Sequence, residues 1–278
     1  MNWFERIIWT LSWRFTDEQG NEYCGIKPYG AFHLVFFAVS VVVGIMMCIF
    51  LRDVREKTMR VILLSASAVL LLLEGYKQLA CSFNGTSWSY SWYNFPFQFC
   101  ATPMYAMVIA GALPDCKVRR GLISYLSTFS LIAGLCVMIF VGEVFQTSIL
   151  GVCIQTMVHH GAMIAIGFWL IAWNRKSADV RGWAYGVLVF VCFEAIALTL
   201  NAVINGALGE GTVDFYYLSP TPTNAYIPVF GFIRNNTPFP VYLLIYNVGF
   251  ALGSFCFYEL TRFMIKTFPE KKPDTMGL

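Results

Sequence analysis

Seven long apolar segments, separated by short polar connections, constrain the fold of this chain more than any other feature. They cover about residues 30–51, 59–81, 95–113, 121–141, 148–173, 182–206 and 239–265. At ~1.5 Å per helical residue, each is long enough to cross the ~30 Å hydrocarbon core of a bilayer. Because 58% of the residues are hydrophobic and only 13% are charged, a soluble domain is excluded. We therefore expect an all-α polytopic membrane protein with seven transmembrane helices.

The basic residues collect on one side of this arrangement. Fourteen of the 19 Lys and Arg follow the first, third, fifth or last segment: Arg52, Arg55, Lys57, Arg60, Lys117, Arg119, Arg120, Arg175, Lys176, Arg181, Arg262, Lys266, Lys271 and Lys272. Positive charge marks the cytoplasmic side of membrane proteins. The sequence therefore predicts an N-terminus outside and a C-terminus in the cytoplasm. The net charge of only +3 argues against a nucleic-acid partner.

The chain is expected to have three parts. These are an N-terminal interfacial segment (1–29), a seven-helix transmembrane domain (30–266) and a cytoplasmic tail (267–278). Residues 2–13 predict a short helix in the headgroup zone, because three Trp occur there among scattered charges. The nine cysteines have no CxxC spacing, so we expect no zinc or disulfide framework. A bridge between Cys24 and Cys81 is left open.

Two adjacent histidines interrupt the fifth apolar segment. His159 and His160 lie within the stretch 155–163, with aliphatic and aromatic residues on both sides. Ionisable groups inside membrane helices are rare, usually face the protein interior and are functional candidates by default. The alternative interpretation is that both imidazoles only bond neighbouring helices.

Other segments place polar groups in the same half of the membrane. Counting from the segment ends puts Glu74, Cys100, His160 and Asn201 ~8–10 Å below the outer face. Glu194 lies near the midplane. His33 is at the outer start of the first segment, and Lys77 shares a helix face with Glu74.

A cysteine beside a histidine can carry out covalent acyl transfer, because the imidazole removes the thiol proton and the sulfur attacks an ester carbonyl. Cys100 stands at the right depth, next to a backbone that Pro103 loosens, and we choose His160 as its base. Supporting or substrate-binding roles are expected among His33, Glu74, Lys77, His159, Glu194 and Asn201. The plainer interpretations are packing for Cys100, an internal ion pair for Glu74 with Lys77, an interhelical hydrogen bond for Asn201 and snorkelling for His33.

A metal site is a competing use of His33, Glu74 and the two adjacent histidines. Neighbouring residues on a helix point about 100° apart and rarely bind one ion, whereas an i, i+4 pair would. We therefore expect neither a metal nor another cofactor.

Several short motifs in order resemble the YwaF family of bacterial membrane proteins. They are Phe32-His33, Glu74, Pro96-Phe-Gln-Phe-Cys100, His160-Gly161, Asn201, and Asp214-Phe-Tyr-Tyr217 with the following prolines, and they extend over about residues 30–260. Animal relatives of that family are described as acyltransferases that make polyunsaturated ether phospholipids with an essential membrane-embedded Cys and His. The resemblance implies that Cys100 and His160 take those roles, and that the protein lies in a bacterial cytoplasmic membrane. A looser similarity links it to membrane lipid hydrolases that use Thr and His.

The preferred hypothesis is a lipid-active enzyme that transfers an acyl chain from a membrane phospholipid through Cys100 and His160. Water as the acceptor would make it a lipid ester hydrolase. The rival hypothesis is a non-catalytic membrane protein, either a small-solute carrier or a partner-binding subunit, in which Glu74, Lys77 and Glu194 contact substrate or protons. A homo-oligomer or another membrane partner is left open.

Overall fold

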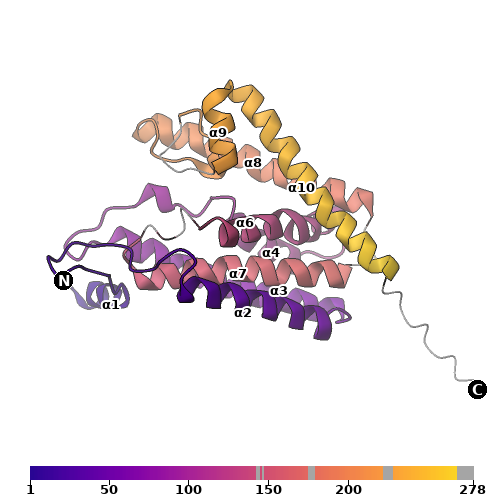
Figure 1. Ribbon diagram of the computed structural model, residues 1–278, viewed down its shortest axis with the longest axis horizontal. Coiled ribbons are helices and arrows are strands. Elements are labelled where there is room, and N and C mark those ends of the chain that lie inside the picture. The colour runs from indigo at the N-terminus through magenta and orange to yellow at the C-terminus, as the bar shows by residue number, and fades with distance from the viewer. Residues whose placement is uncertain (142–144, 146, 175–178, 222–227, 268–278) are drawn as a thin grey trace, which may run out of the picture.

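The computed structural model describes residues 1–141, 145, 147–174, 179–221 and 228–267, and these residues are mainly helical (Figure 1). The helices in chain order are α1 (Trp3–Leu11), α2 (Ala31–Phe50), α3 (Glu56–Ser82), α4 (Thr102–Ala112), α5 (Lys117–Tyr125), α6 (Leu131–Ile139), α7 (Leu150–Asn174), α8 (Val180–Leu208), α9 (Pro228–Asn236) and α10 (Phe239–Thr267). The short helical turns are η1 (Trp92–Asn94), η2 (Leu126–Ser130) and η4 (Phe215–Tyr217). The all-α membrane fold is thereby confirmed.

Six helical stretches are long and apolar enough to cross a membrane. They are Ala31–Phe50, Glu56–Ser82, Lys117–Ile139, Leu150–Asn174, Val180–Leu208 and Phe239–Leu260. Each corresponds to one of the apolar segments expected from the sequence. The count of seven spans and the orientation of the termini stay predictions. Arg175, Lys176 and the tail beyond residue 267 lie outside the described residues.

The third expected segment, 95–113, is not one long helix. Only α4 is regular, and its 11 residues cover ~17 Å, about half of a hydrocarbon core. Pro103 stands in the first turn of α4, where its missing N–H costs no helical hydrogen bond. The proline therefore begins the helix, instead of loosening one that already contains Cys100, and residues 95–101 precede it as irregular backbone.

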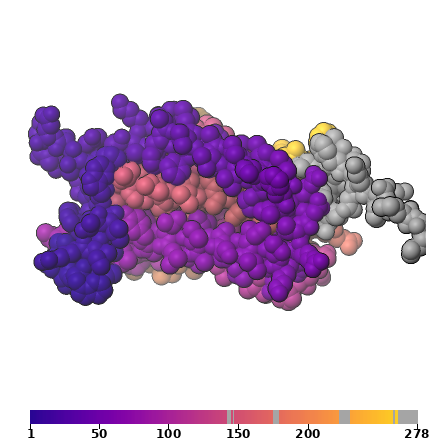
Figure 2. Space-filling model, turned by 90° about the horizontal axis from the view of Figure 1, so that it is seen from below, coloured from indigo at the N-terminus to yellow at the C-terminus, as the bar shows by residue number. Residues whose placement is uncertain are grey.

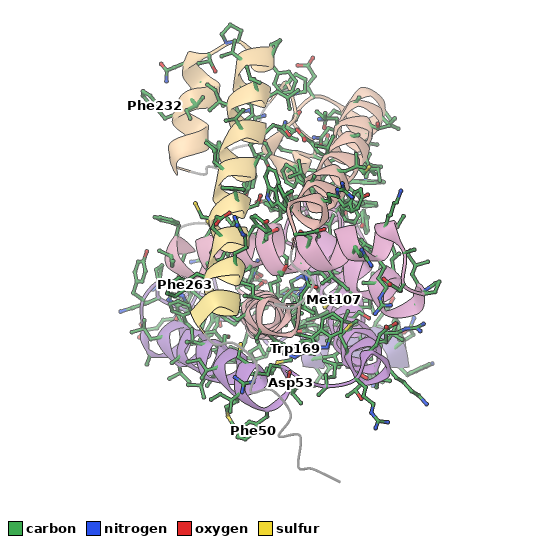
Figure 3. The ribbon with its side chains drawn as sticks, turned by 90° about the vertical axis from the view of Figure 1, so that its right-hand side faces the viewer. Phe50, Asp53, Met107, Trp169, Phe232 and Phe263 are labelled. Carbon is green, nitrogen blue, oxygen red and sulfur yellow. The ribbon has the colours of Figure 1, made fainter. Side chains whose placement is uncertain are left out.

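Helix α7 is the central helix of the first and larger group of helices. It packs against α2, α3, α6 and η2, and in Figure 2 it shows as a strip at the bottom of a furrow between α2 and α3. Close approach depends on small residues, since a Cβ on Gly167 would meet the Leu131 Cβ at 2.8 Å. Trp169 is fully buried in the middle of the end-on view (Figure 3) and donates to the Leu51 carbonyl at 2.9 Å.

Helices α8, α9 and α10 form a second group that lies above α7 in Figure 1. The α8 helix packs along α5, and α10 contacts η2, so the α5–η2–α6 run joins the two groups. That run is the one described stretch where the backbone turns π-helical, at Leu126–Ser130.

The N-terminal segment covers the C-terminal end of α3 and the N-terminal end of α7. An Asn2–Glu5 capping box begins α1. Arg14 donates to the carbonyls of Ala80 and Phe83 at 3.5 and 3.0 Å, where the last carbonyls of α3 lack helical partners. The Tyr76 hydroxyl donates to the Leu11 carbonyl at 2.9 Å. We call this end of the molecule the α1 end, and the opposite end, where α3 and α8 begin, the basic end.

Both cysteines considered for a disulfide are free. Cys24 and Cys81 carry no bridge in the structure. The N-terminal segment is instead held to α3 and α7 by hydrogen bonds, including one from the Leu150 amide to the Trp13 carbonyl at 3.0 Å.

Candidate functional site

Cys100 lies in a tight turn immediately before α4. The turn is closed by the Ala101 amide, which donates to the Gln98 carbonyl at 2.8 Å. Phe99 and Ala101 are buried on either side, and Cys100 is partly buried with a free thiol. Irregular backbone at membrane depth is stable only where protein or a polar cavity surrounds it. The turn therefore depends on the side chains that enclose it.

His159 contacts this turn directly. Its Nε2 lies 2.7 Å from the Cys100 carbonyl oxygen. Because a carbonyl only accepts, Nε2 must carry the proton in this bond. The other ring nitrogen, Nδ1, is buried and has no partner among the described residues, so in the neutral imidazole it holds a free lone pair.

His160 faces away from the Cys100 carbonyl and bonds its own helix. Its Nδ1 donates to the Thr156 carbonyl, one turn earlier, at 2.7 Å. Its Nε2 is buried, and nothing in the described part of the chain bonds it, so the neutral ring again has a free lone pair. The two imidazoles lie with their centroids 5.7 Å apart. In the described part of the chain no hydrogen bond joins the Cys100 thiol to either ring.

A buried carboxylate holds α3 against α7 next to these histidines. Glu74 is 3% exposed and pairs with Lys77 at 2.7 Å. It also accepts from Gln78 at 2.7 Å and from Gln155 at 3.2 Å. Gln155 stands one turn before His159, as the i, i+4 spacing predicts, so one face of α7 carries both contacts.

Residues of the loop between α3 and α4 close this cluster from the α1 end. The Tyr90 hydroxyl donates to the Gln78 side chain at 2.8 Å, and the Gln78 amide reaches the Asn94 carbonyl at 2.5 Å. Burial raises the pKa of the Tyr90 phenol, and the Glu74 charge adds to this effect. The phenol therefore remains a donor at neutral pH.

Three buried hydroxyls support the Cys100 turn from the other side. Thr102 donates to the Phe99 carbonyl at 2.9 Å. The hydroxyls of Tyr125 and Tyr216 each lie 2.7 Å from the Thr102 oxygen. Since the Thr102 proton is used by the carbonyl, both tyrosines are the donors.

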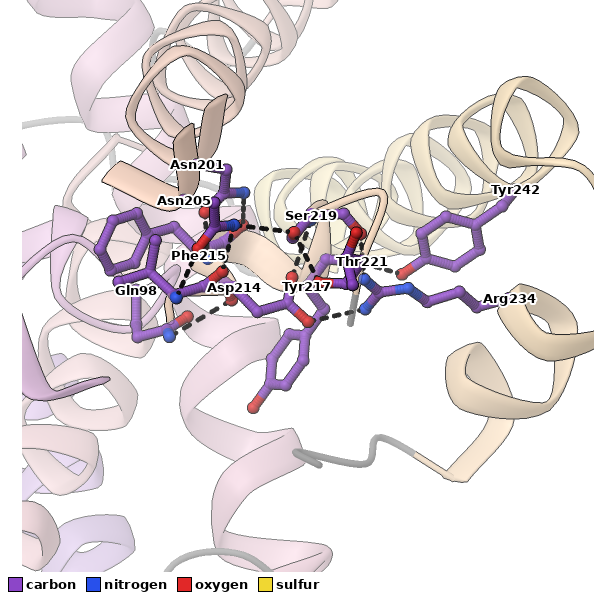
Figure 4. Close-up of polar contacts among 11 residues, drawn as sticks. Gln98, Asn201, Asn205, Asp214, Phe215, Tyr217, Ser219, Thr221, Arg234 and Tyr242 are labelled. Carbon is purple, nitrogen blue, oxygen red and sulfur yellow. Dashed lines mark hydrogen bonds and ion pairs between the residues drawn. The ribbon is translucent and has the colours of Figure 1, made fainter. Parts of the chain in front are cut away.

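Tyr216 belongs to a loop, residues 213–221, that is buried over most of its length and exposed at Pro220 and Thr221; Figure 4 shows it in detail. Tyr216 and Tyr217 both have φ of 58°, a left-handed conformation that is unusual for bulky residues. Asn201 clamps the loop by accepting from the Phe215 amide at 2.7 Å and donating to its carbonyl at 3.0 Å. Asn205 makes the same two-way contact with Val213.

An ion pair fixes the far side of the loop. The Arg234 Nη1 donates to the Asp214 carboxylate at 2.8 Å, and the two side chains are 9% and 1% exposed. Arg234 also donates to the Ser219 carbonyl, and the Asp214 carbonyl accepts from Gln98 at 3.3 Å. The loop is thus tied both to α9 and to the residues that form the Cys100 turn (Figure 4).

Two of the expected supporting residues have their hydrogen bonds elsewhere. His33 is buried on α2, with Nε2 at 3.0 Å from the Met138 carbonyl. Glu194 on α8 accepts from Asn247 on α10 at 2.7 Å. Each joins a pair of helices, and within the described ranges neither has a hydrogen bond to the cluster around Cys100.

The structure thus gathers Glu74, Lys77, His159 and Cys100 at one place, with His160 adjacent to His159. Sequence reasoning put Asn201 in the same role as these, but its amide holds the 213–221 loop. The sequence reasoning did not single out Thr102, Tyr125 or Arg234, because no motif or unusual spacing marks their hydroxyl and guanidinium groups. Asp214-Phe-Tyr-Tyr217 was noticed only as part of a family pattern.

Metal ligands do not cluster in the described part of the chain. No group of three or more His, Cys, Asp or Glu side chains there has the geometry to hold an ion. The polar groups around Cys100 are joined by hydrogen bonds.

Comparison with known proteins gives one match. A sequence model of the TMEM164 family matches residues 28–258. No curated protein matches the chain, and no solved structure matches it. The matched range begins just before α2 and ends within α10, so it contains the whole site and leaves α1 outside. The match supports a membrane protein of this type, and assignment to YwaF by name stays an expectation.

Proposed function

The chain belongs to the TMEM164 family of membrane proteins, and we propose that it transfers acyl chains from phospholipids through Cys100. The observation that carries the proposal is the Cys100 turn, which lies outside any helix and is bonded by His159, and among the described residues His159 and its chain neighbour His160 each keep a free ring nitrogen. We place the reaction near the outer leaflet of a bacterial cytoplasmic membrane, at the α1 end of the bundle.

In the first half-reaction the ester carbonyl of a phospholipid is attacked by the Cys100 sulfur. His160 Nε2 takes the thiol proton while the S–C bond forms, and a side-chain rotation of Cys100 brings the thiol to it. The C–O bond of the ester then breaks, and His160 returns the proton to the departing alkoxide. The products are a lysophospholipid and an acyl thioester on Cys100.

In the second half-reaction the hydroxyl of a lysolipid gives its proton to His160 and attacks the thioester carbonyl. The C–S bond breaks, and the thiolate recovers the proton from the imidazolium. Water in place of the lysolipid gives a free fatty acid, which is the hydrolase variant of the same chemistry.

His159 and Glu74 act as positioning residues in this proposal. His159 holds the Cys100 carbonyl at 2.7 Å, and this bond fixes the turn relative to α7. The Glu74–Gln155 bond keeps the same face of α7 against α3. Lys77 compensates the Glu74 charge, and its side chain, at 18% exposure, is the group that would meet a lipid phosphate.

The test is acyl turnover of purified protein with a phospholipid donor and a lysophospholipid acceptor. We expect Cys100→Ala and His160→Ala to abolish turnover, and His159→Ala to lower it. A general base or its nucleophile typically contributes ~10²–10⁴-fold to the rate. Cys136→Ala makes the same chemical change at an exposed position and should leave turnover unchanged. If Cys100→Ala and His160→Ala keep full activity, a non-catalytic role replaces this proposal.

A further inference from the structure

A second polar site lies at the basic end, far from Cys100. A pocket of about 170 Å³ opens there among the starts of α3, α5 and α8 and the ends of α7 and α10. Glu56 lines it, and Glu74 of the Cys100 cluster stands 18 residues further along α3, which is ~27 Å of helix. The pocket is therefore separate from the acyl-transfer site.

Arg119 is the buried charge of this pocket. Its side chain is 3% exposed, and Nη1 donates to Glu56 at 2.5 Å. Its Nε is buried, and no acceptor for it exists among the described residues. Buried donors in folded proteins almost always have an acceptor. A ligand oxygen bound in the pocket would supply one.

The π-helical turn η2 supplies hydroxyls to the same wall. Ser127 and Thr128 both line the pocket, and both donate to the Ser124 carbonyl, at 3.1 and 2.7 Å. Their protons are used, so their oxygens are left as acceptors. π-Helical turns are rare and frequent at functional sites. These acceptors suit an N–H donor on a ligand better than a second oxyanion.

The charged and aromatic residues of the lining also suit a ligand with a cationic group. The described lining contains two arginines, Arg119 and Arg120, and three carboxylates, Glu56, Asp115 and Asp179, so it offers partners for groups of both signs of charge. Three aromatic residues also line the pocket, namely Trp173, Trp183 and Tyr258, and aromatic rings attract cations.

We propose that this pocket binds a small zwitterion that carries an oxyanion and an ammonium group a few bonds apart. The oxyanion accepts from Arg119 Nε. The ammonium donates to the Ser127 and Thr128 oxygens and faces Asp179. The headgroup of an ethanolamine phospholipid and a soluble phosphodiester of ethanolamine share this chemistry.

Calorimetric titration of the full chain in nanodiscs of phosphatidylglycerol tests the proposal. Glycerophosphoethanolamine is the zwitterionic probe. Glycerol 3-phosphate, which carries only the negative charge, and ethanolamine, which carries only the positive charge, are the two controls. We expect saturable binding of the zwitterion, and at least about ten-fold weaker binding of either single-charge compound. Absence of saturable zwitterion binding, or equal affinity for all three compounds, would overturn the proposal.

Two variants locate the binding within the pocket. Arg119→Gln should weaken zwitterion binding by about ten-fold or more, whereas Arg181→Gln removes the same charge from an exposed residue outside the lining and should not. Asp179→Asn keeps a good N-cap for α8, so it folds even if Arg119→Gln does not. It should bring zwitterion affinity down to that of glycerol 3-phosphate. Unchanged affinity in Asp179→Asn would contradict the proposed place of the ammonium.

Two further arms identify the source of the ligand and separate the two sites. If phosphatidylethanolamine in the nanodisc lowers the affinity for the soluble probe, a lipid headgroup occupies the pocket. If it does not, the ligand comes from the aqueous side. Cys100→Ala should bind the probe as the unaltered protein does, so loss of acyl transfer and loss of this site are distinguishable.

Discussion

The ion pair between Asp214 and Arg234 makes the sharpest prediction about what supports the Cys100 turn. Arg234→Gln removes the guanidinium and leaves a carboxylate that is 1% exposed. Breaking a buried pair by removing one partner costs ~3–5 kcal/mol. We therefore expect Arg234→Gln to lower the free energy of unfolding by about that amount, since water cannot reach the carboxylate.

The double variant Asp214→Asn with Arg234→Gln tests the cause. It removes both charges, and the Asn oxygen can still accept from the Ser219 amide, which now bonds the carboxylate at 2.8 Å. We expect most of the lost stability to return, because a buried pair replaced as a whole is often nearly neutral. The measurement is unfolding in mixed micelles, followed by circular dichroism, for both single variants and the double variant.

The matched control is an exposed pair of the same kind. Arg262 and Glu259 lie 2.8 Å apart at 45% and 41% exposure, and exposed pairs contribute only ~0–1 kcal/mol. Arg262→Gln should therefore change little. If the losses from the two single variants at Asp214 and Arg234 simply add in the double variant, the charges do not depend on one another and the reasoning is wrong.

Three further predictions concern packing, charge and acid. Gly167→Ala should destabilise the protein by ~1–3 kcal/mol through overpacking. Gly75→Ala places its new Cβ with nothing within 4 Å and should stabilise the protein by ~0.5–1 kcal/mol. The melting temperatures of the two variants should therefore shift in opposite directions. Lys77→Met should lower the free energy of unfolding by ~3–5 kcal/mol, because it leaves the buried Glu74 carboxylate uncompensated. Adding Glu74→Gln to this variant should restore most of the lost stability. Hydrogen bonds from Asn21 lower the pKa of Asp17. The stability that Asp17 contributes is therefore complete above its ordinary pKa of ~3.9 and is lost as the pH falls through the lower pKa of the folded state. Amide exchange of residues 17–21 should accelerate only in acid, and Asp17→Ala should abolish that pH dependence.

Features set by helix length and spacing could be predicted from the sequence. The long apolar runs predict where the six long helices begin and end, because each helix must cover a similar distance. The i, i+4 spacing of Gln155 and His159 is visible in the sequence and implies one shared face of α7, and both side chains do reach the side of α3 and the Cys100 turn. Lys77 and Glu74 pair as their spacing suggests.

Features set by the rotation of helices and by irregular backbone could not be predicted in this way. Equal depth suggested that His33 and Asn201 would meet Cys100, but depth says nothing of the direction in which a side chain points. The third apolar segment is irregular over residues 95–101, where helix side chains satisfy backbone carbonyls: His159 of α7 bonds that of Cys100, and Tyr105 of α4 bonds that of Pro96. These are tertiary contacts, which the local sequence does not contain. Left-handed tyrosines such as Tyr216 are held by tertiary contacts, which propensity does not contain.

Intact-mass analysis of the protein after brief incubation with phospholipid donor and no acceptor addresses the role of Cys100 most directly. We expect a mass increase of one acyl chain, located by peptide mapping to Cys100 and removed by neutral hydroxylamine, as a thioester requires. His160→Ala should show no such adduct, while Cys136→Ala should show it in full. Turnover of phospholipid without any adduct on Cys100, or an adduct that forms equally well without His160, would contradict the account.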